Sequence, residues 1–127
     1  MDHAEGGRCL VAVVDDDESV RESLPDLLRA SGYEAEAFAS GEAFLASSDL
    51  DRTQCLILDI AMPGMSGPEL QRELKRRGQG MPVVYITAHA DDTVRPRLLE
   101  EGAVDCLFKP FSETALLSAL SSALRVA

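Results

Sequence analysis

The stretch that decides the fold is Cys55–Gly67, CLILDIAMPGMSG. Its apolar run is bounded by turn residues and predicts a buried strand, which ends abruptly at Asp59 before a loop rich in Pro and Gly. A carboxylate in that position lies at the carboxyl edge of a sheet, where open α/β sheets bind their ligands. Because Asp also initiates turns and caps helices, a site at Asp59 requires partners from elsewhere in the chain.

Four further apolar runs predict strands, and a helical pattern follows each strand. The additional strands are expected over 9–14, 34–38, 83–87 and 103–108, and the helices over 19–30, 41–45, 67–77, 94–101 and 113–124, with Asp91-Asp92 leading into the fourth helix. Strict alternation of strands and helices predicts an α/β fold of the (βα)5 type, a doubly wound parallel five-stranded sheet with helices on both faces. The strand order 2-1-3-4-5 would make it flavodoxin-like.

Local signals mark the starts of several helices. Ser66-Gly67-Pro68-Glu69 matches a capping box with Pro near the first helical position, and Ser112 is expected to cap the last helix. Asp17 is expected to cap the first helix rather than to bind metal. Pro25 falls inside that first helix, where we expect a bend or a locally open turn.

The composition restricts the class of protein. The chain has 127 residues with 46% hydrophobic content, which fits one domain over 1–127 with a flexible tail at 1–7. No apolar segment approaches the ~20 residues of a membrane span and no signal-peptide core is present, so we expect a cytoplasmic protein without a membrane partner. A net charge of −10 predicts no direct nucleic-acid binding. Cys9, Cys55 and Cys106 are expected to be buried free thiols.

Chemically suggestive residues gather where the predicted strands end. Asp15 and Asp16 follow the first strand, Asp59 the third, Thr87 the fourth and Lys109 the fifth. In the order 2-1-3-4-5 the first and third strands are neighbours, which brings the three carboxylates together. Such a cluster is self-repelling unless a cation joins it, and its oxygen ligands suit Mg²⁺.

The same residues suggest phosphoryl transfer. A carboxylate can act as a nucleophile and form an aspartyl phosphate, while Mg²⁺ neutralises phosphoryl oxygens. Asp59 is the expected nucleophile because it stands between the acidic pair on one side and Thr87 and Lys109 on the other. Thr87 and Lys109 would bind the remaining phosphoryl oxygens.

Four separated motifs, in order, resemble the receiver domains of two-component response regulators, especially those of the nitrogen-fixation and nodulation type. The motifs are VVDDDES (13–19), LILDIAMPGMSG (56–67), VVYITAHA (83–90) and GAVDCLFKPF (102–111). The resemblance implies that a sensor histidine kinase or phosphotransfer protein phosphorylates Asp59. It also implies a conformational switch on the face formed by the fourth helix, fifth strand and fifth helix.

The resemblance also assigns individual roles. Asp16, Asp59 and the backbone carbonyl of Ala61 would ligate Mg²⁺, with Asp15 assisting through water. The Lys109-Pro110 bond is expected to be cis, although such bonds make up only about 5–6% of X-Pro bonds. Further implied partners are an output domain or effector protein and a second copy of the chain on phosphorylation. The domain would not be an enzyme, because it catalyses only its own phosphorylation and dephosphorylation.

Three positions bear on how the switch works. Cys106 stands where receivers usually carry Tyr or Phe, so the usual aromatic switch cannot operate there. At the position of Ala61 many members of the family carry a larger polar side chain that shapes the path of attacking water. His89 occupies the other position that tunes phosphate lifetime in the family, and a solvated loop residue is an equally good interpretation of it.

Three alternative functions share parts of this pattern, and one feature of the sequence speaks against each of them. A magnesium phosphohydrolase would need an acid/base carboxylate where this chain has Ala61. A flavodoxin-like FMN carrier would need a Ser/Thr/Gly-rich phosphate loop where this chain has DDDE at 15–18. A receiver used only for docking, without phosphorylation, would have no need of the complete acidic set.

Overall fold

The fold is described by a computed structural model that covers residues 9–88 and 93–126. The predicted tail at 1–7, His89 and the predicted helix start at Asp91-Asp92 lie outside these residues. Within the described part of the chain, no helix has both the length and the apolar character needed to cross a membrane.

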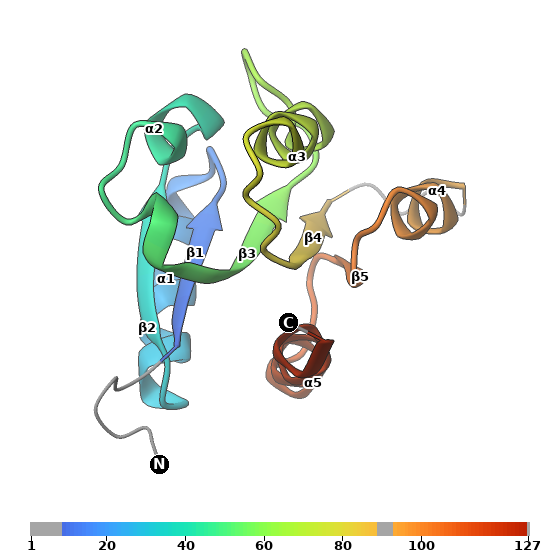
Figure 1. The fold of residues 1–127 in the computed structure, drawn as a ribbon. Coiled ribbons are helices and arrows are strands. Elements are labelled where there is room, and N and C mark those ends of the chain that lie inside the picture. The colour runs from blue at the N-terminus through green and yellow to red at the C-terminus, as the bar shows by residue number, and fades with distance from the viewer. Residues whose placement is uncertain (1–8, 89–92, 127) are drawn as a thin grey trace.

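Five strands form one parallel sheet in the order β2-β1-β3-β4-β5, which confirms the predicted topology (Figure 1). The strands are β1 (Leu10–Val14), β2 (Glu34–Phe38), β3 (Thr53–Asp59), β4 (Val83–Thr87) and β5 (Asp105–Phe108). The strand β1 is buried along its whole length because neighbouring strands flank it and helices cover both of its faces. The edge strand β2 instead alternates charged residues with apolar ones.

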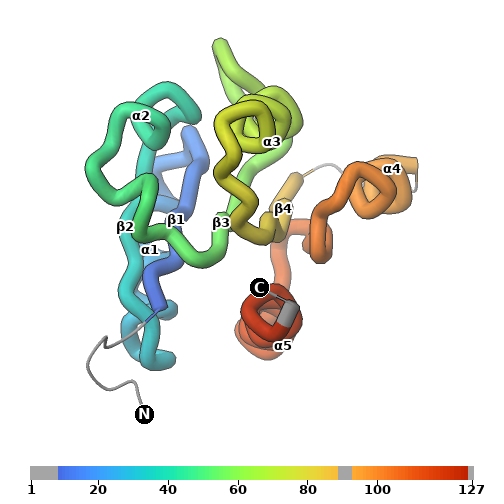
Figure 2. The backbone as a smooth tube through the Cα atoms, in the orientation of Figure 1, coloured from blue at the N-terminus to red at the C-terminus, as the bar shows by residue number. Residues whose placement is uncertain are grey.

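A helix follows every strand, as the alternating pattern predicts. The helices are α1 (Glu18–Ala30), α2 (Gly41–Leu45), α3 (Gly67–Arg76), α4 (Val94–Glu100) and α5 (Glu113–Val126), with a short 3₁₀ helix over Leu50–Arg52. The backbone trace shows each helix leading back toward the start of the next strand (Figure 2). This connection brings the carboxyl ends of all five strands to one edge of the sheet.

The core consists of two apolar layers, one on each face of the sheet. On one face, Leu28 of α1 and Leu120 of α5 pack against strand residues such as Ile57. On the other face, Phe44 of α2 and Leu70 of α3 belong to a second cluster, together with α4 residues. The alternation of side chains along each strand therefore supplies both layers at once.

The predicted caps are confirmed. The Asp17 side chain accepts a hydrogen bond from the Ser19 amide at the start of α1, and Ser66 and Glu69 form the reciprocal capping box of α3. The Ser112 hydroxyl accepts from the Ala115 amide at the start of α5. The helix α1 continues through Pro25 without interruption.

Two strand starts and one burial class differ most clearly from the prediction. The strand β3 begins at Thr53 rather than near Cys55, directly after a 3₁₀ turn that the sequence did not predict. The strand β5 begins at Asp105 rather than at Ala103. All three cysteines are free, and Cys55 and Cys106 are buried as expected, but Cys9 just before β1 is only half-buried.

Candidate functional site

The carboxyl edge of the sheet brings the predicted site residues together from four strands. Asp15 and Asp16 follow β1, and Asp59 is the last residue of β3. Thr87 is the last residue of β4, and Lys109 comes directly after β5. Because β1 lies beside β3, one carboxylate oxygen from each of the three Asp residues lies within 4.8 Å of the others.

This acidic cluster has the composition and spacing of a site for one small hard cation. Oxygens on opposite sides of one Mg²⁺ are about 4 Å apart, so a spacing of up to 4.8 Å requires little adjustment. Asp15 and Asp59 are buried, whereas Asp16 is exposed, so the cation would bind where the protein meets water. The side chains therefore fit Mg²⁺, which retains several water ligands.

Asp15 is held by partners on both of its carboxylate oxygens. The Lys109 ammonium lies 3.0 Å from Oδ2, and the Asp17 amide donates to Oδ1 at 2.9 Å. The Arg21 guanidinium also donates to the Asp15 backbone carbonyl at 3.1 Å. This pairing of Lys109 with Asp15, across 94 residues of sequence, is not among the sequence predictions.

The electrostatic position of Asp59 is different. Burial, with the neighbouring carboxylate of Asp15, raises the pKa of Asp59 from 3.8 to about 6, and the Lys109 ammonium only partly opposes this. The exposed Asp16 carboxylate makes a smaller contribution to this raised pKa. The ionised form of Asp59 is therefore destabilised, and a bound cation would stabilise it.

The loop after β3 returns to the backbone of Asp59 and Ile60 at Gly67. The Gly67 amide donates to the Ile60 carbonyl at 2.9 Å, and Ser66, directly before Gly67, begins the capping box of α3. A Cβ on Gly67 would overlap the carbonyl oxygen of Asp59, so the close approach requires glycine here. Ala61 lies exposed in this loop, and its role as a carbonyl ligand stays a prediction.

The other side of the site is formed by the ends of β4 and β5. Thr87 is buried, and its backbone carbonyl accepts from the Lys109 amide at 2.7 Å. The Lys109-Pro110 peptide bond is cis, as expected from the family resemblance. Cys106 is buried, and burial together with the neighbouring Asp105 raises the pKa of its thiol, which disfavours thiolate chemistry.

Sequence reasoning missed two polar side chains beneath the site. The Tyr85 hydroxyl of β4 donates to Oε1 of Gln71 of α3 at 2.6 Å, and both residues are buried. Gln71 lies next to Leu70 on the buried stripe of α3, and a polar residue at such a position is the signal that could have revealed the pair. Tyr85 is also the direct neighbour of Cys106 across the β4 and β5 strands.

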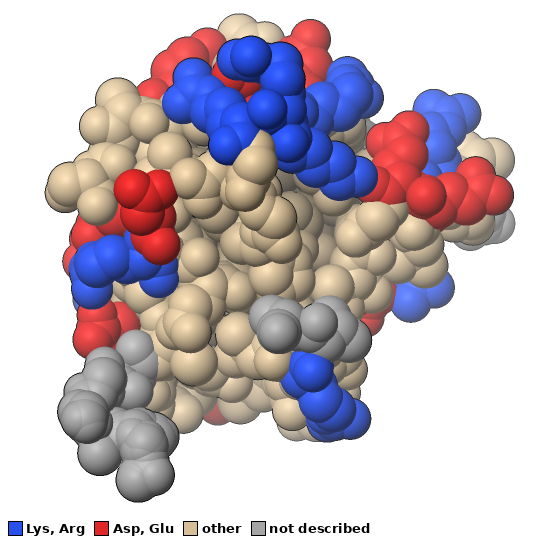
Figure 3. All heavy atoms as spheres, in the orientation of Figure 1, with Lys and Arg blue, Asp and Glu red and all other residues tan. Residues whose placement is uncertain are grey.

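Charge is distributed unevenly over the surface. Figure 3 shows Lys and Arg side chains gathered over α3 and acidic side chains toward α4. Part of the basic charge on α3 is neutralised within the helix, because Glu73 forms ion pairs with Arg76 and Arg77. Lys75 reaches across to α4, where its ammonium donates to the Glu101 carbonyl at 2.7 Å.

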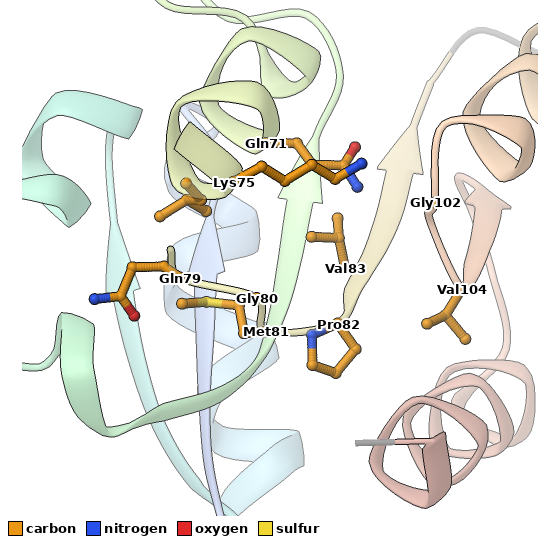
Figure 4. A pocket seen from close by; sticks show the side chains of 10 residues that line it. Gln71, Lys75, Gln79, Gly80, Met81, Pro82, Val83, Gly102 and Val104 are labelled. Carbon is orange, nitrogen blue, oxygen red and sulfur yellow. The ribbon is translucent and has the colours of Figure 1, made fainter. Parts of the chain in front are cut away.

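A hollow of about 230 Å³ lies below α3, at the amino ends of β4 and β5, away from the acidic edge (Figure 4). Gln71 and Lys75 border it from α3, and Pro82 and Val83 from the start of β4. This hollow and the acidic cluster therefore lie at opposite ends of the strands.

Comparison with known proteins identifies the family. Residues 11–121 match the family model of the response regulator receiver domain. The chain is 38% identical over 125 residues to response regulator protein TodT of Pseudomonas putida, a match that covers 98% of this chain and 55% of TodT. It is 43% identical over 122 residues to nodulation protein W of Bradyrhizobium diazoefficiens, covering 95% of this chain and 54% of that protein. The crystal structure of FixJ-N matches with a TM-score of 0.83 and 36% identity, over 94% of this chain and 95% of that one.

The chain belongs to the response regulator receiver domain family of two-component signal transduction. The resemblance to the nitrogen-fixation and nodulation type of regulator is thereby confirmed. The chain spans about half the length of the curated relatives described above.

Proposed function

We propose that Asp59 accepts a phosphoryl group from the phosphohistidine of a sensor histidine kinase or phosphotransfer protein. The observation that carries the proposal is the buried Asp59 carboxylate, which lies beside two further carboxylates and within the electrostatic influence of the cation Lys109. In a receiver domain, this arrangement places a nucleophile among groups that can stabilise the charge of a phosphoryl group.

The transfer exchanges one bond to phosphorus for another. A carboxylate oxygen of Asp59 attacks the phosphorus of the phosphohistidine, so an O–P bond forms while the N–P bond breaks. The imidazole nitrogen leaves with the bonding electron pair and takes up a proton from water. By analogy with other phosphorylated side chains, the product carries a charge of about −1.5 to −2.

The other residues of the site bind Mg²⁺ and the phosphoryl oxygens. Mg²⁺, when bound, neutralises phosphoryl oxygens, and we assign Asp15, Asp16, Asp59 and the Ala61 carbonyl to hold it. The Thr87 hydroxyl and the Lys109 ammonium bind other phosphoryl oxygens. Because Lys109 contacts Asp15 before transfer, formation of the phosphoryl group gives this ammonium a second anionic partner.

The proposal extends to the partners of the domain. The added charge draws Thr87 and Lys109 inward and changes the face formed by α4, β5 and α5, which an output domain, an effector or a second copy would recognise. Arg95 of α4 and Asp105 of β5, 2.8 Å apart, already join two parts of this face. The domain acts only on itself rather than as an enzyme for another substrate, and its proposed location with the kinase is the cytoplasm.

Acetyl phosphate provides a direct test because it donates a phosphoryl group without a partner protein. Intact mass should show one added phosphoryl group on the wild-type protein with MgCl₂, and no addition with EDTA. Asp59→Asn should remain unlabelled because its amide is not a nucleophile. Asp16→Asn should label at least about 10-fold more slowly, because it loses a metal ligand.

Asp17→Asn is the matched control. Asp17 is an exposed carboxylate next to the acidic pair, but its side chain caps α1, a role that Asn fulfils equally well. This variant should label at the wild-type rate. Unchanged labelling of Asp59→Asn would refute the assignment of the phosphoacceptor, and equal labelling in EDTA would refute the role of Mg²⁺.

A further inference from the structure

A single side chain, Tyr85, supports the start of α3 at two points. Its hydroxyl donates to Oε1 of Gln71 at 2.6 Å. Its ring lies close to Gly67, because a Cβ added at Gly67 would be 3.0 Å from Cε1 of the Tyr85 ring. Gly67 and Gln71 are four residues apart on α3, so they lie one above the other on the same side of the helix. The ring and the hydroxyl of Tyr85 therefore fix the first turn of the helix together.

The first turn of α3 is in turn tied to the phosphoacceptor loop. The Gly67 amide donates to the Ile60 carbonyl at 2.9 Å, next to Asp59 on one side and Ala61 on the other. This bond closes the loop over residues 60–67. A shift of α3 along its axis would stretch the bond and move the backbone that carries Ala61.

The Tyr85–Gln71 hydrogen bond is shielded from water, so losing it is energetically costly. Gln71 is only 6% exposed and Tyr85 is fully buried, so bulk solvent replaces a lost partner poorly. Burial raises the pKa of the Tyr85 phenol well above its ordinary value, so the hydroxyl keeps its proton and remains a donor. Removing the hydroxyl alone would leave Oε1 of Gln71 without this donor.

We propose that Tyr85 is a positioning residue for the phosphorylation site, acting through Gln71 and Gly67 to hold the Asp59 loop in its metal-binding conformation. This inference rests on the proposed function, because it concerns the loop that presents the Ala61 carbonyl to Mg²⁺. Tyr85 itself lies below the site, two residues before Thr87 on β4. Its neighbour on β5 is Cys106.

The test compares Tyr85→Phe, Gln71→Met and the double variant. Tyr85→Phe keeps the ring against Gly67 and removes only the donor, while Gln71→Met removes the acceptor. In metal-free protein, each single variant should speed hydrogen exchange of the Gly67 amide, measured by NMR. Each should also weaken Mg²⁺ binding, measured by calorimetry, by about 10-fold, the lower end of the range for outer partners of metal ligands. The double variant should bind Mg²⁺ no more weakly than either single variant, because the same bond is already broken.

Thr53→Val is the matched control for the loss of a buried side-chain hydrogen bond. The Thr53 hydroxyl donates to the Asp49 carbonyl at 2.8 Å at the opposite end of β3 from Asp59. This variant should lower stability without changing Mg²⁺ affinity or exchange of the Gly67 amide.

The outcomes separate this inference from the proposed function. Unchanged Mg²⁺ affinity and unchanged Gly67 exchange in Tyr85→Phe would overturn the positioning role. Equal changes in Thr53→Val would also overturn it, since the effect would then reflect general destabilisation. If the wild-type protein binds no Mg²⁺, the proposed function fails, whereas the exchange measurement on metal-free protein still decides whether Tyr85 holds the loop.

Discussion

At the carboxyl edge of the sheet the structure buries the carboxylates of Asp15 and Asp59, whereas the layer between the sheet and α1 and α5 buries aliphatic side chains such as Leu28 and Leu120. The edge contains three clustered carboxylates, and Lys109 forms an ion pair with only one of them. Burial stabilises the aliphatic side chains but raises the free energy of the charged ones.

The difference shows that stability and reactivity come from different parts of the same strands. The middle of each central strand contributes to the two apolar layers, and its end contributes to the site. Substitutions of aliphatic side chains in the layer under α1 and α5 should therefore change the free energy of unfolding without changing the chemistry. Substitutions at the edge should change the chemistry and can even increase stability.

The largest loss of stability is expected from Leu120→Ala in α5. Leu120 is fully buried, and deleting its side chain should lower the free energy of unfolding by about 3 kcal/mol. Urea denaturation measures this loss. Phosphorylation by acetyl phosphate, per folded molecule, should remain at the wild-type rate.

The exposed Ser118 on the same helix gives the control Ser118→Ala, which should change neither the free energy of unfolding nor the labelling rate. A large loss of labelling in folded Leu120→Ala would contradict the separation of the two regions.

Lys109→Met should give the next largest loss of stability, because it removes the ammonium that pairs with the fully buried Asp15 carboxylate. The partial exposure of Lys109 moderates the cost of breaking this ion pair, which we expect to be about 2–3 kcal/mol in metal-free protein. Thermal unfolding with and without MgCl₂ should show a larger stabilisation by Mg²⁺ in the variant than in the wild type. Lys75→Met is the control, and equal Mg²⁺ stabilisation of Lys109→Met and wild type would contradict the role of Lys109 as the local counter-charge.

Asp59→Asn should increase stability at neutral pH. The folded protein raises the pKa of Asp59 from 3.8 to about 6, so folding favours its protonated form. Stability from this group is therefore complete below about pH 4 and is lost as the pH rises through about 6. Replacing the carboxylate should gain about 2 kcal/mol at pH 7.5 in metal-free protein. Urea denaturation across pH should show that this gain disappears below about pH 4. A gain of the same size at both pH values would show that charge is not its cause.

Ser66→Ala should have the smallest effect of the series. It removes the hydroxyl that accepts from the Glu69 amide in the α3 capping box and should lower the free energy of unfolding, measured by urea denaturation, by about 1 kcal/mol. Ser66→Thr retains a capping hydroxyl and should lose much less. If Ser66→Ala were as stable as the wild type, the capping box would contribute nothing to the start of α3.

The topology and the positions of the reactive residues could be predicted because they follow from local patterns. Apolar runs of strand length, followed by helical periodicity, imply parallel pairing, and parallel pairing brings every strand end to one edge. This reasoning placed Asp15, Asp16 and Asp59 together, as observed. The start of β3 was missed because Thr53 and Gln54 are polar and do not extend the apolar run.

The partners of individual side chains could not be predicted in the same way. The pairing of Lys109 with Asp15 depends on how two strand ends meet across the sheet, and no sequence pattern specifies which anion a Lys contacts. The Tyr85–Gln71 bond depends on how α3 packs over β4. Residue patterns fix which face a side chain occupies, whereas its partner is decided only by three-dimensional packing.

The central claim, that Asp59 is the phosphoacceptor, is tested most directly by trapping the modified residue. The protein is labelled with acetyl phosphate and MgCl₂ and reduced with borohydride, which converts an acyl phosphate to an alcohol. The digested protein is then mapped by mass spectrometry. The account predicts homoserine at position 59 in labelled protein and none in protein treated with EDTA. Reduction at Asp15 or Asp16 instead, or labelling with no reducible acyl phosphate, would contradict it.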